Sequence, residues 1–346
     1  MNKKILKIGS LFCGCGGSDL GALGGFKYIN TNYKKLPTQI SYALDIDQKA
    51  INTYNHNFKH PAVVGSVTDV KPVDIPDFDI LIGGFPCQSF STVNPTKDPF
   101  DDRGQLYKDM AKILKDKQPK AFIAENVKGL MVLKKGEIFR SVLKEFEQQG
   151  YRLSFHLLNS ANYGIPQRRQ RVFIVGIRKD INKTFKFPSP LFYENPDSNH
   201  KSWVPLKQVI KSLVPDDNKY YFSKRAVEGM KNAKKNMKRG LWQDLEKTCL
   251  TITSHLAKVS LNSRDPVLLV SPKEELYRRF TPQEAASIQS FPENFKFVGS
   301  EADAYRQIGN AIPPVLMWNV MKKLIETLDE SVQIVQKENK KELVEA

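Results

Sequence analysis

The chain has 346 residues, of which 40% are hydrophobic and 26% are charged, and its formal net charge at pH 7 is +16. This length allows a full hydrophobic core and two domains. No apolar run approaches the roughly 20 residues that span a bilayer, and the N-terminus lacks the apolar region of a signal peptide. These features exclude a membrane-spanning protein and predict a cytoplasmic one without membrane association.

Short apolar runs alternate with amphipathic stretches in the first half of the chain. This alternation predicts an α/β fold with a doubly wound, mostly parallel sheet. Helices are expected at residues 106–114 and 138–148, and Gly150 should end the second one. The expected strands are residues 5–12, 40–44, 62–64, 79–82, 121–124, 153–158 and 172–177.

The pattern changes after about residue 178. Residues 181–275 lose the strand–helix alternation, which indicates an inserted or second domain. Order returns at Thr281-Pro282-Gln283-Glu284, a capping box with proline at the first helical position, and Pro313-Pro314 opens a last helix. We therefore divide the chain into residues 1–180, 181–275, 276–328 and a charged tail, 329–346, which we expect to fray.

The four cysteines argue against a metal site. Cys13 and Cys15 are too close for an ordinary disulfide or a zinc knuckle, and no Cys-x-x-Cys spacing occurs with Cys87 or Cys249. The five histidines are scattered along the chain. We expect reduced thiols and no bound metal.

Cys87 follows the predicted strand at residues 79–82 through a turn of glycines and a proline. Open α/β sheets bind their ligands at such strand tips. Cys87 is therefore a candidate nucleophile, although free cysteines are also among the most buried residues. Its position alone favours neither a reactive nor a structural role.

A glycine-rich turn, Phe12 to Asp19, follows the first strand, and Asp45 ends the second. Such a turn lets a nucleotide-like ligand approach the backbone, and an acidic residue after the second strand typically binds ribose hydroxyls. The third glycine of the dinucleotide fingerprint is misplaced, which disfavours a pyrophosphate site. An adenosine ligand is indicated, without separating NAD from S-adenosylmethionine.

Two further charged segments lie at strand ends. Glu125 directly follows a strand, where a helix N-cap is the alternative role. The segment Gln167-Arg168-Arg169-Gln170-Arg171 precedes another strand, where a solvated face is the alternative. Both segments and Cys87 converge on one edge of the predicted sheet.

In chain order, these segments closely resemble the motifs of the prokaryotic cytosine-C5 DNA methyltransferase family. The resemblance covers nearly the whole chain outside residues 181–275, and the fixed order of the motifs makes it specific. The matching segments are Ser10-Leu11-Phe12-Cys13-Gly14-Cys15-Gly16-Gly17, Gly84-Phe85-Pro86-Cys87-Gln88-Ser89-Phe90-Ser91, Asp102-Arg103-Gly104-Gln105-Leu106, Glu125-Asn126-Val127, Gln167-Arg168-Arg169-Gln170-Arg171-Val172, Arg279-Phe280-Thr281-Pro282-Gln283-Glu284-Ala285 and Gln307-Ile308-Gly309-Asn310-Ala311-Ile312.

The resemblance implies a Rossmann-like, S-adenosylmethionine-dependent catalytic domain and a smaller target-recognition domain at residues 181–275. It implies that the Cys87 thiolate adds to carbon 6 of a flipped cytosine, which activates carbon 5 for methylation. Glu125 would bond or protonate ring nitrogen 3, and Arg171 would hold the carbonyl at position 2. Arg169, in the same motif, is assigned to catalysis and to DNA contact.

The resemblance also assigns cofactor and DNA contacts. Where the family usually has an acidic residue for the adenine amine, this chain has Ser66, so looser binding or a substitute such as Asp69 is expected. The cofactor residues are Phe12, Gly14, Gly16, Gly17, Asp45, Ile46, Ser66, Val67, Pro86, Leu106, Asn310 and Ala311. The DNA contacts are Ser91 in a mobile loop, Arg169, Thr251, and a basic cluster that is alternatively a solvated helix face, Lys231, Lys234, Lys235, Lys238 and Arg239.

The implied partners are double-stranded DNA and a possible cognate restriction endonuclease, with a monomeric enzyme. Three alternatives were weighed. A tRNA-methylating relative should carry a Cys-Phe-Thr signature, which is absent. A catalytically silent DNA-binding relative is disfavoured because Cys87, Glu125 and Arg171 are all present. A nicotinamide oxidoreductase leaves those three residues unexplained.

Overall fold

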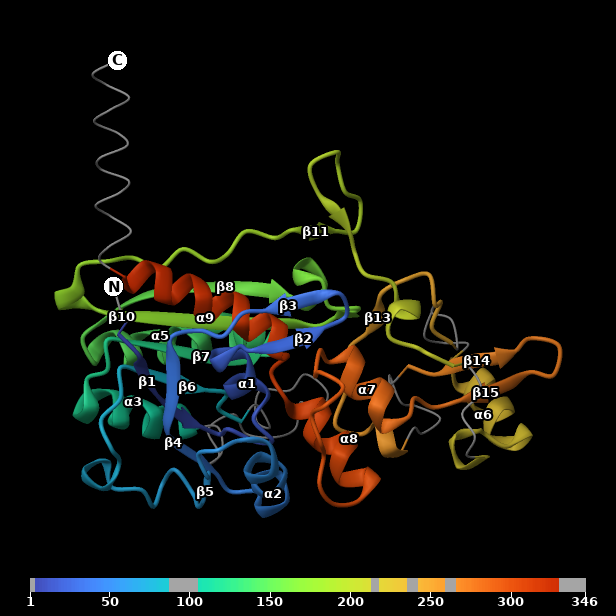
Figure 1. Ribbon diagram of the computed structural model, residues 1–346, viewed down its shortest axis with the longest axis horizontal. Helices are drawn as coiled ribbons and strands as arrows, with labels where there is room; N and C mark the ends of the chain where they lie inside the picture. The colour runs from blue at the N-terminus through green and yellow to red at the C-terminus, as the bar shows by residue number, and fades with distance from the viewer. Residues whose placement is uncertain (1–3, 87–104, 213–217, 235–241, 259–265, 330–346) are drawn as a thin grey trace.

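The structure is a computed structural model (Figure 1) that describes residues 4–86, 105–212, 218–234, 242–258 and 266–329. Cys87 and Ser91 lie outside these ranges, as do Lys235, Lys238 and Arg239 of the basic cluster and the predicted tail beyond residue 329. In the described part of the chain, no helix has the length and apolar character needed to cross a membrane.

A seven-stranded sheet forms the centre of the molecule, in the order β5-β4-β1-β6-β7-β10-β8. The first five strands are parallel, and β10 runs antiparallel to both of its neighbours. All seven predicted strands are confirmed. Their bounds are β1 Leu6–Leu11, β4 Thr38–Asp45, β5 Val63–Val64, β6 Ile80–Gly83, β7 Ala121–Val127, β8 Tyr151–Asn159 and β10 Gln170–Arg178.

The strand order reverses direction between β1 and β6. From β1 the chain moves outward to β4 and β5, then returns to the other side of β1 as β6. Ligand crevices of open α/β sheets form at such a switch point, outside the carboxyl ends of the strands. The loops that leave β1 and β6 therefore mark where a site should lie.

Helices cover both faces of the sheet, because alternate strand residues point to opposite sides. One core cluster joins Ile8, Ile82 and Ile123 to α1, α2 and α9, and the other joins Leu81 and Phe122 to α3 and α5. The helices expected at residues 106–114 and 138–148 are confirmed within a few residues, as is the last helix, which opens at Pro313-Pro314. Their bounds are α1 Gly17–Leu23, α2 Gln48–Asn57, α3 Leu106–Lys117, α4 Gly129–Val132, α5 Glu137–Gln148 and α9 Pro314–Leu328.

A short hairpin, β2 Phe26–Tyr28 and β3 Thr31–Tyr33, was not predicted. Strands of three residues are too short for an alternation pattern to be read from sequence. The hairpin is held by tertiary packing, since Tyr33 stacks on Phe26 and meets the Trp318 ring edge-on.

In Figure 1 the first part of segment 181–275 runs along the top of the molecule to β11, and its later part, with α6, lies at the right; α7 Pro282–Ile288 and α8 Glu301–Asn310 lie between this right-hand part and the sheet. The capping box at Thr281 and Glu284 is confirmed, and Ser300 and Asp303 form a second one at α8. The remaining elements are β9 Gln167–Arg168, β11 Phe192–Tyr193, β12 Lys201–Ser202, α6 Lys224–Lys234, β13 Cys249–Leu250, β14 Leu268–Ser271 and β15 Leu276–Arg278.

Segment 181–275 shares its core with the sheet. Leu206, Cys249 and Ile252 belong to the same cluster as Ile8, whereas a separate small cluster contains Val227, Met230, Val267 and Tyr277. The predicted boundary after residue 275 falls in the turn between the paired strands β14 and β15. The domain division from composition therefore does not coincide with a break in packing there.

Candidate active site

The loop between β1 and α1 turns through left-handed backbone at Phe12 (φ +54°), Gly14 (φ +54°) and Gly16 (φ +92°). A Cβ on Gly14 would meet nothing within 4 Å, so this glycine faces open space. A Cβ on Gly16 would lie 2.2 Å from the Phe58 ring, and one on Gly17 would lie 2.6 Å from the Ile312 carbonyl oxygen. Of these three glycines, Gly14 leaves room for a ligand, and the other two are required for close packing.

Asp45 lies beside this loop. Its Oδ2 accepts a hydrogen bond from the Gly14 backbone N–H at 2.8 Å, and its Oδ1 accepts one from the Asp47 N–H at 2.8 Å. Burial raises the pKa of Asp45, and these backbone bonds act in the opposite direction. Each carboxylate oxygen has a second lone pair, so Asp45 has acceptor capacity for ligand hydroxyls. The adjacent Ile46 side chain is 73% exposed and offers an apolar surface.

The C-terminal motif reaches the same place from the far end of the chain. Ile312 contacts the glycine loop through its carbonyl oxygen, and its side chain would lie 3.5 Å from a Cβ on Gly84, just beyond β6. Asn310 is exposed at the last turn of α8, and Ala311 follows it. The structure therefore brings Gly14, Asp45 and the 310–312 segment to one edge of the sheet.

Glu125 and Arg171 form an ion pair at that edge. Arg171 Nε lies 3.1 Å from Glu125 Oε1, and both side chains are largely buried. Antiparallel pairing of β10 with β7 produces this contact by placing Arg171 opposite Val127. Burial raises the pKa of Glu125, and the charges of Arg171 and Arg169 act in the opposite direction. A Cβ on Gly84 would lie 3.6 Å from Glu125 Oε2, so the carboxylate faces the segment that leads to Cys87.

Asn126 is a functional candidate that sequence reasoning gave no role. Its Nδ2 donates to the Phe85 carbonyl oxygen at 3.0 Å, two residues before Cys87. Its Oδ1 accepts from the Val127 N–H at 2.8 Å, which fixes the orientation of the amide. Asn126 therefore anchors the start of the segment that carries Cys87, which is a contact that no sequence pattern specifies.

The side chain of Arg169 does not lie at the surface, where the expected DNA contact would require it to be. Its side chain is buried, and its guanidinium donates to the carbonyl oxygens of Ile252 at 3.0 Å, Gly309 at 2.9 Å and Ala311 at 3.2 Å. Phosphate or base contact would require this group to leave the interior. Arg169 instead joins the arginine motif to the C-terminal motif and to segment 181–275.

Lys231 and Thr251, two other predicted DNA contacts, are engaged within the protein. Lys231 Nζ pairs with Glu275 Oε1, and the Thr251 hydroxyl donates to the Arg168 carbonyl oxygen at 2.8 Å. The Thr251 bond extends the pairing of β13 with β9. Thr251 thereby links segment 181–275 to the arginine motif.

The remaining predicted cofactor residues have mixed environments. The Ser66 hydroxyl lies 2.7 Å from that of Thr68, within the loop after β5. Val67 is buried in the core cluster of α3, and Leu106 and Phe12 pack against that cluster. Pro86 is half-buried directly before Cys87. Among the residues with described positions, no group of metal-binding side chains occurs.

Asp19 is a buried carboxyl below the glycine loop that sequence reasoning did not identify. It accepts hydrogen bonds from the hydroxyls of Ser10 at 2.9 Å, Ser18 at 2.9 Å and Tyr54 at 3.0 Å. Burial raises the pKa of Asp19 from 3.8 to about 6, and the three hydroxyl bonds offset only part of this effect. The folded protein therefore keeps the Asp19 carboxyl protonated up to a higher pH than the unfolded chain does.

The Asp19→Asn variant should have a different pH dependence of stability. Because the folded pKa is raised, the stability from Asp19 is present below pH 3.8 and is lost as pH rises toward about 6. Between pH 4.5 and 7.5, wild type should lose about 2 kcal/mol of unfolding free energy relative to this variant. Urea unfolding at several pH values measures the difference. Asp116→Asn, at an exposed carboxyl on α3, is the control and should have the same pH dependence as wild type. The prediction would be wrong if the unfolding free energies of wild type and Asp19→Asn differed by a constant amount at every pH.

Comparison with known proteins places this site in a family. Residues 6–326 match the family model described as C-5 cytosine-specific DNA methylase. The Type II methyltransferase M.FnuDI of Fusobacterium nucleatum is 34% identical, with 95% of this chain and 97% of that protein covered. M.NgoFVII of Neisseria gonorrhoeae, also named a Type II methyltransferase, is 31% identical, with 95% and 89% covered.

Solved structures show the same fold. The Entamoeba histolytica methyltransferase EhMeth superposes with a TM-score of 0.70 at 19% identity, with 95% of this chain and 100% of that chain covered. A variant of Spodoptera frugiperda DNMT2 gives a TM-score of 0.70 at 21% identity, with 93% and 100% covered. The family match spans the sheet, the glycine loop, the Glu125–Arg171 pair and α8, and the chain therefore belongs to the C-5 cytosine-specific DNA methylase family and is a DNA (cytosine-5-)-methyltransferase.

Proposed function

We propose that this enzyme methylates carbon 5 of a flipped cytosine in duplex DNA through a covalent adduct of Cys87 at carbon 6. The observation that carries this proposal is the buried Glu125–Arg171 pair, which faces Gly84 three residues before Cys87. A carboxyl and a guanidinium are the groups that a cytosine ring needs when a nucleophile adds to it. The target atom is stacked inside a duplex, so the base must leave the helix to reach them.

The proposed chemistry begins with the Cys87 thiolate. Its sulfur forms a bond to carbon 6, and the electrons of the carbon 5–carbon 6 double bond move into the ring, which makes carbon 5 nucleophilic. Glu125, whose pKa is raised by burial, protonates or hydrogen-bonds ring nitrogen 3, and Arg171 stabilises the charge on the position-2 oxygen. After methylation, solvent water takes the proton from carbon 5, the electrons of that bond re-form the carbon 5–carbon 6 double bond, and the sulfur leaves carbon 6 with its bonding pair as the Cys87 thiolate.

Cys87 is the thiol best suited to this step. Burial raises the pKa of Cys13, Cys15 and Cys249, the three cysteines whose positions the structure describes. Such thiols stay protonated and are poor nucleophiles. The segment just before Cys87 lies beside the Glu125–Arg171 pair, because Asn126, next to Glu125 in β7, donates a hydrogen bond to the Phe85 carbonyl oxygen.

The residues around the glycine loop fit S-adenosylmethionine. Gly14 borders open space, Asp45 has acceptor capacity for ribose hydroxyls, and the exposed Ile46 offers a surface for adenine. When bound, S-adenosylmethionine supplies an activated methyl group. Asn310 and Ala311 would hold its methionine end, while Phe12, Ser66, Val67, Pro86 and Leu106 would complete the pocket.

The proposal extends to the DNA site and the biological setting. Segment 181–275 would read the target sequence, and basic residues of the cluster other than Lys231, which pairs with Glu275, would contact phosphates. Because the relatives above are named Type II methyltransferases, we propose that this enzyme acts in a restriction-modification system, as a monomer and beside an endonuclease of the same specificity.

The test uses duplex DNA in which the target cytosine carries fluorine at carbon 5. Fluorine replaces the proton that must leave, so wild-type enzyme with S-adenosylmethionine should form a complex that survives denaturing electrophoresis. Cys87→Ala should form no such complex and should lose methylation of ordinary duplex DNA. Cys249→Ala removes a buried thiol elsewhere and should keep both activities.

Two results would overturn the proposal. Methyl transfer by Cys87→Ala at the wild-type rate would exclude the covalent mechanism. Methylation of tRNA in preference to duplex DNA by the wild-type enzyme would exclude the proposed substrate. Sequencing of 5-methylcytosine in DNA from cells that express the chain would identify the recognised site.

A further inference from the structure

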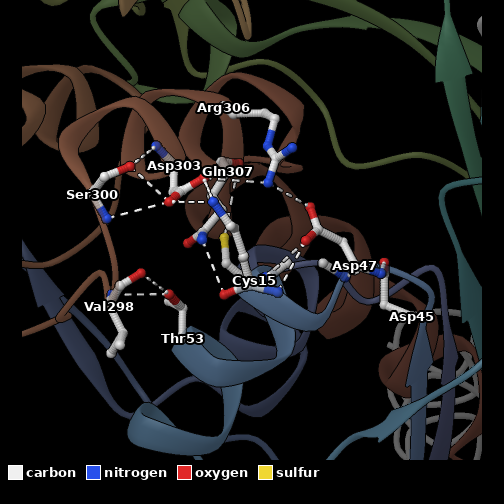
Figure 2. A network of polar contacts seen from close by, with 12 residues as sticks. Cys15, Asp45, Asp47, Thr53, Val298, Ser300, Asp303, Arg306 and Gln307 are labelled. Carbon is white, nitrogen blue, oxygen red and sulfur yellow. Dashed lines mark hydrogen bonds and ion pairs between the residues drawn. The ribbon is translucent and has the colours of Figure 1, made fainter.

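We propose that four alternating charges between α2 and α8 form a brace that positions Asp45 for the cofactor, with Arg306 as its central positioning residue. The brace consists of Asp47, Arg306, Asp303 and Lys49. Figure 2 labels the first three. This inference rests on the proposed cofactor site, because it assigns to these residues the geometry of that site.

Asp47 connects the brace to the pocket. Its backbone N–H donates to Asp45 Oδ1 at 2.8 Å, so the position of Asp47 sets that of the predicted ribose ligand. Its own Oδ1 caps α2 by accepting from the Lys49 N–H at 3.0 Å and the Ala50 N–H at 3.4 Å. Its Oδ2 lies 3.1 Å from the Arg306 guanidinium on α8. Asp47 therefore has one link to each of the two helices and one to the pocket.

Asp303 completes the brace from the α8 side. It lies 2.9 Å from Lys49 Nζ and 3.5 Å from Arg306, and it accepts from the Ser300 hydroxyl at 2.7 Å in the α8 capping box. The bonds from Ser300 and the ammonium of Lys49 lower the pKa of Asp303 to about 2. Asp303 thus remains charged at any physiological pH, and the brace keeps its alternating order of charge.

Neutral contacts extend the brace to the glycine loop. Gln307 Nε2 donates to the Lys49 carbonyl oxygen at 3.1 Å, and the Gln307 carbonyl oxygen lies 3.8 Å from Cys15 Sγ (Figure 2). Arg306 and Gln307 are in the last turns of α8, which ends at Asn310. One helix therefore sets the distance between Asp45, at the ribose end of the proposed pocket, and Asn310, at its methionine end.

The same helix interface has a second set of contacts that is remote from the pocket. At the end of α2, Asn57 Nδ2 donates to the Lys296 carbonyl oxygen at 2.7 Å, and Asn57 Oδ1 accepts from the Lys296 N–H at 3.0 Å. These bonds hold α2 against the segment before α8 without contacting Asp45 or Asp47. Asn57 is therefore a matched control: it separates a contact that only holds the helices together from one that also positions the cofactor.

The experiment compares Arg306→Gln, Asp47→Asn and the double variant with wild type and Asn57→Ala. Asparagine caps a helix as well as aspartate, so Asp47→Asn removes the charge and keeps the α2 cap. Arg306 and Asp47 are 45% and 34% exposed, and exposed ion pairs are weak. We therefore expect Kd and KM for S-adenosylmethionine to rise about 3- to 5-fold in each single variant, with kcat and KM for DNA within about twofold.

Two further readouts identify the ion pair. The double variant should bind S-adenosylmethionine no more weakly than Arg306→Gln, because that single variant already removes the Asp47–Arg306 pair. The ratio of variant to wild-type Kd should fall toward 1 as salt rises to about 1 M, because salt screens exposed charges. Asn57→Ala should lower the melting temperature and leave Kd unchanged.

Direct calorimetric titration with S-adenosylmethionine separates the two proposals. No binding by wild type would overturn the proposed cofactor site itself. Binding by wild type, together with an unchanged Kd in Arg306→Gln, would overturn the brace while the cofactor site stands. An equal rise in Kd for Asn57→Ala would also overturn it, because the effect would then be one of general helix packing.

Discussion

Replacing Glu125 with glutamine should lower kcat for methyl transfer by about 10²- to 10⁴-fold, the usual contribution of a positioned general acid. Glutamine fills the same space and still accepts a bond from Arg171, but its amide is not an acid and cannot transfer a proton to ring nitrogen 3. Asp45 and the glycine loop are unchanged, so Kd for S-adenosylmethionine should stay within about twofold. Single-turnover methylation of a duplex carrying the target site measures the chemical step.

The pH dependence of the same variant is a second readout. Burial raises the pKa of Glu125, so wild-type kcat should fall as pH rises through this raised pKa and the carboxyl loses its proton. The kcat of Glu125→Gln should not show this decrease with rising pH. Glu145→Gln, on α5, is the matched control and should retain wild-type kcat. A wild-type rate in Glu125→Gln would remove Glu125 from the mechanism.

Replacing Arg169 with methionine should lower the unfolding free energy by about 3–5 kcal/mol, as expected when a buried charged side chain that bonds several partners is removed. The carbonyl oxygens of Ile252, Gly309 and Ala311 would lose the donors they now have. Urea unfolding measures the free energy. Arg168→Met, at the neighbouring exposed side chain, should change it by no more than about 0.5 kcal/mol.

This prediction distinguishes an internal support from a DNA contact. At a temperature where Arg169→Met is still folded, its Kd for DNA should depend on salt with the same slope as wild type, because no phosphate contact has been removed. A reduced salt slope with unchanged stability would restore Arg169 to the DNA surface. The buried position of its guanidinium makes that outcome incompatible with the structure.

The central sheet could be predicted because its strands have clear sequence patterns. β6 and β7 are buried on both faces and appear as continuous apolar runs, and the boundaries of α7 and α9 are marked by a capping box and by proline. The β2–β3 hairpin was missed because three-residue strands that pack on Trp318 have no periodic signal of their own.

The roles of individual polar residues could be predicted only in part. The sequence predicted Asp45, Glu125 and Arg171 as site residues at strand ends; in the structure Asp45 ends β4, whereas Glu125 and Arg171 lie within β7 and β10. The sequence could not show that Asn126 anchors Phe85, or that Asp47 and Arg306, more than 250 residues apart, meet between two helices. Such contacts depend on how helices and loops pack, which local patterns do not encode.

By itself, the sequence determined the element order, and it predicted which edge of the sheet carries the proposed chemistry and which charged groups lie there. Only the tertiary structure decided which of those groups lie beside the segment that leads to Cys87 and which are fixed inside. Arg169 and Arg171 illustrate the difference: they are two residues apart, yet one guanidinium bonds to buried carbonyl oxygens and the other pairs with Glu125. The partners available to each side chain come from distant segments, so its role is settled by packing.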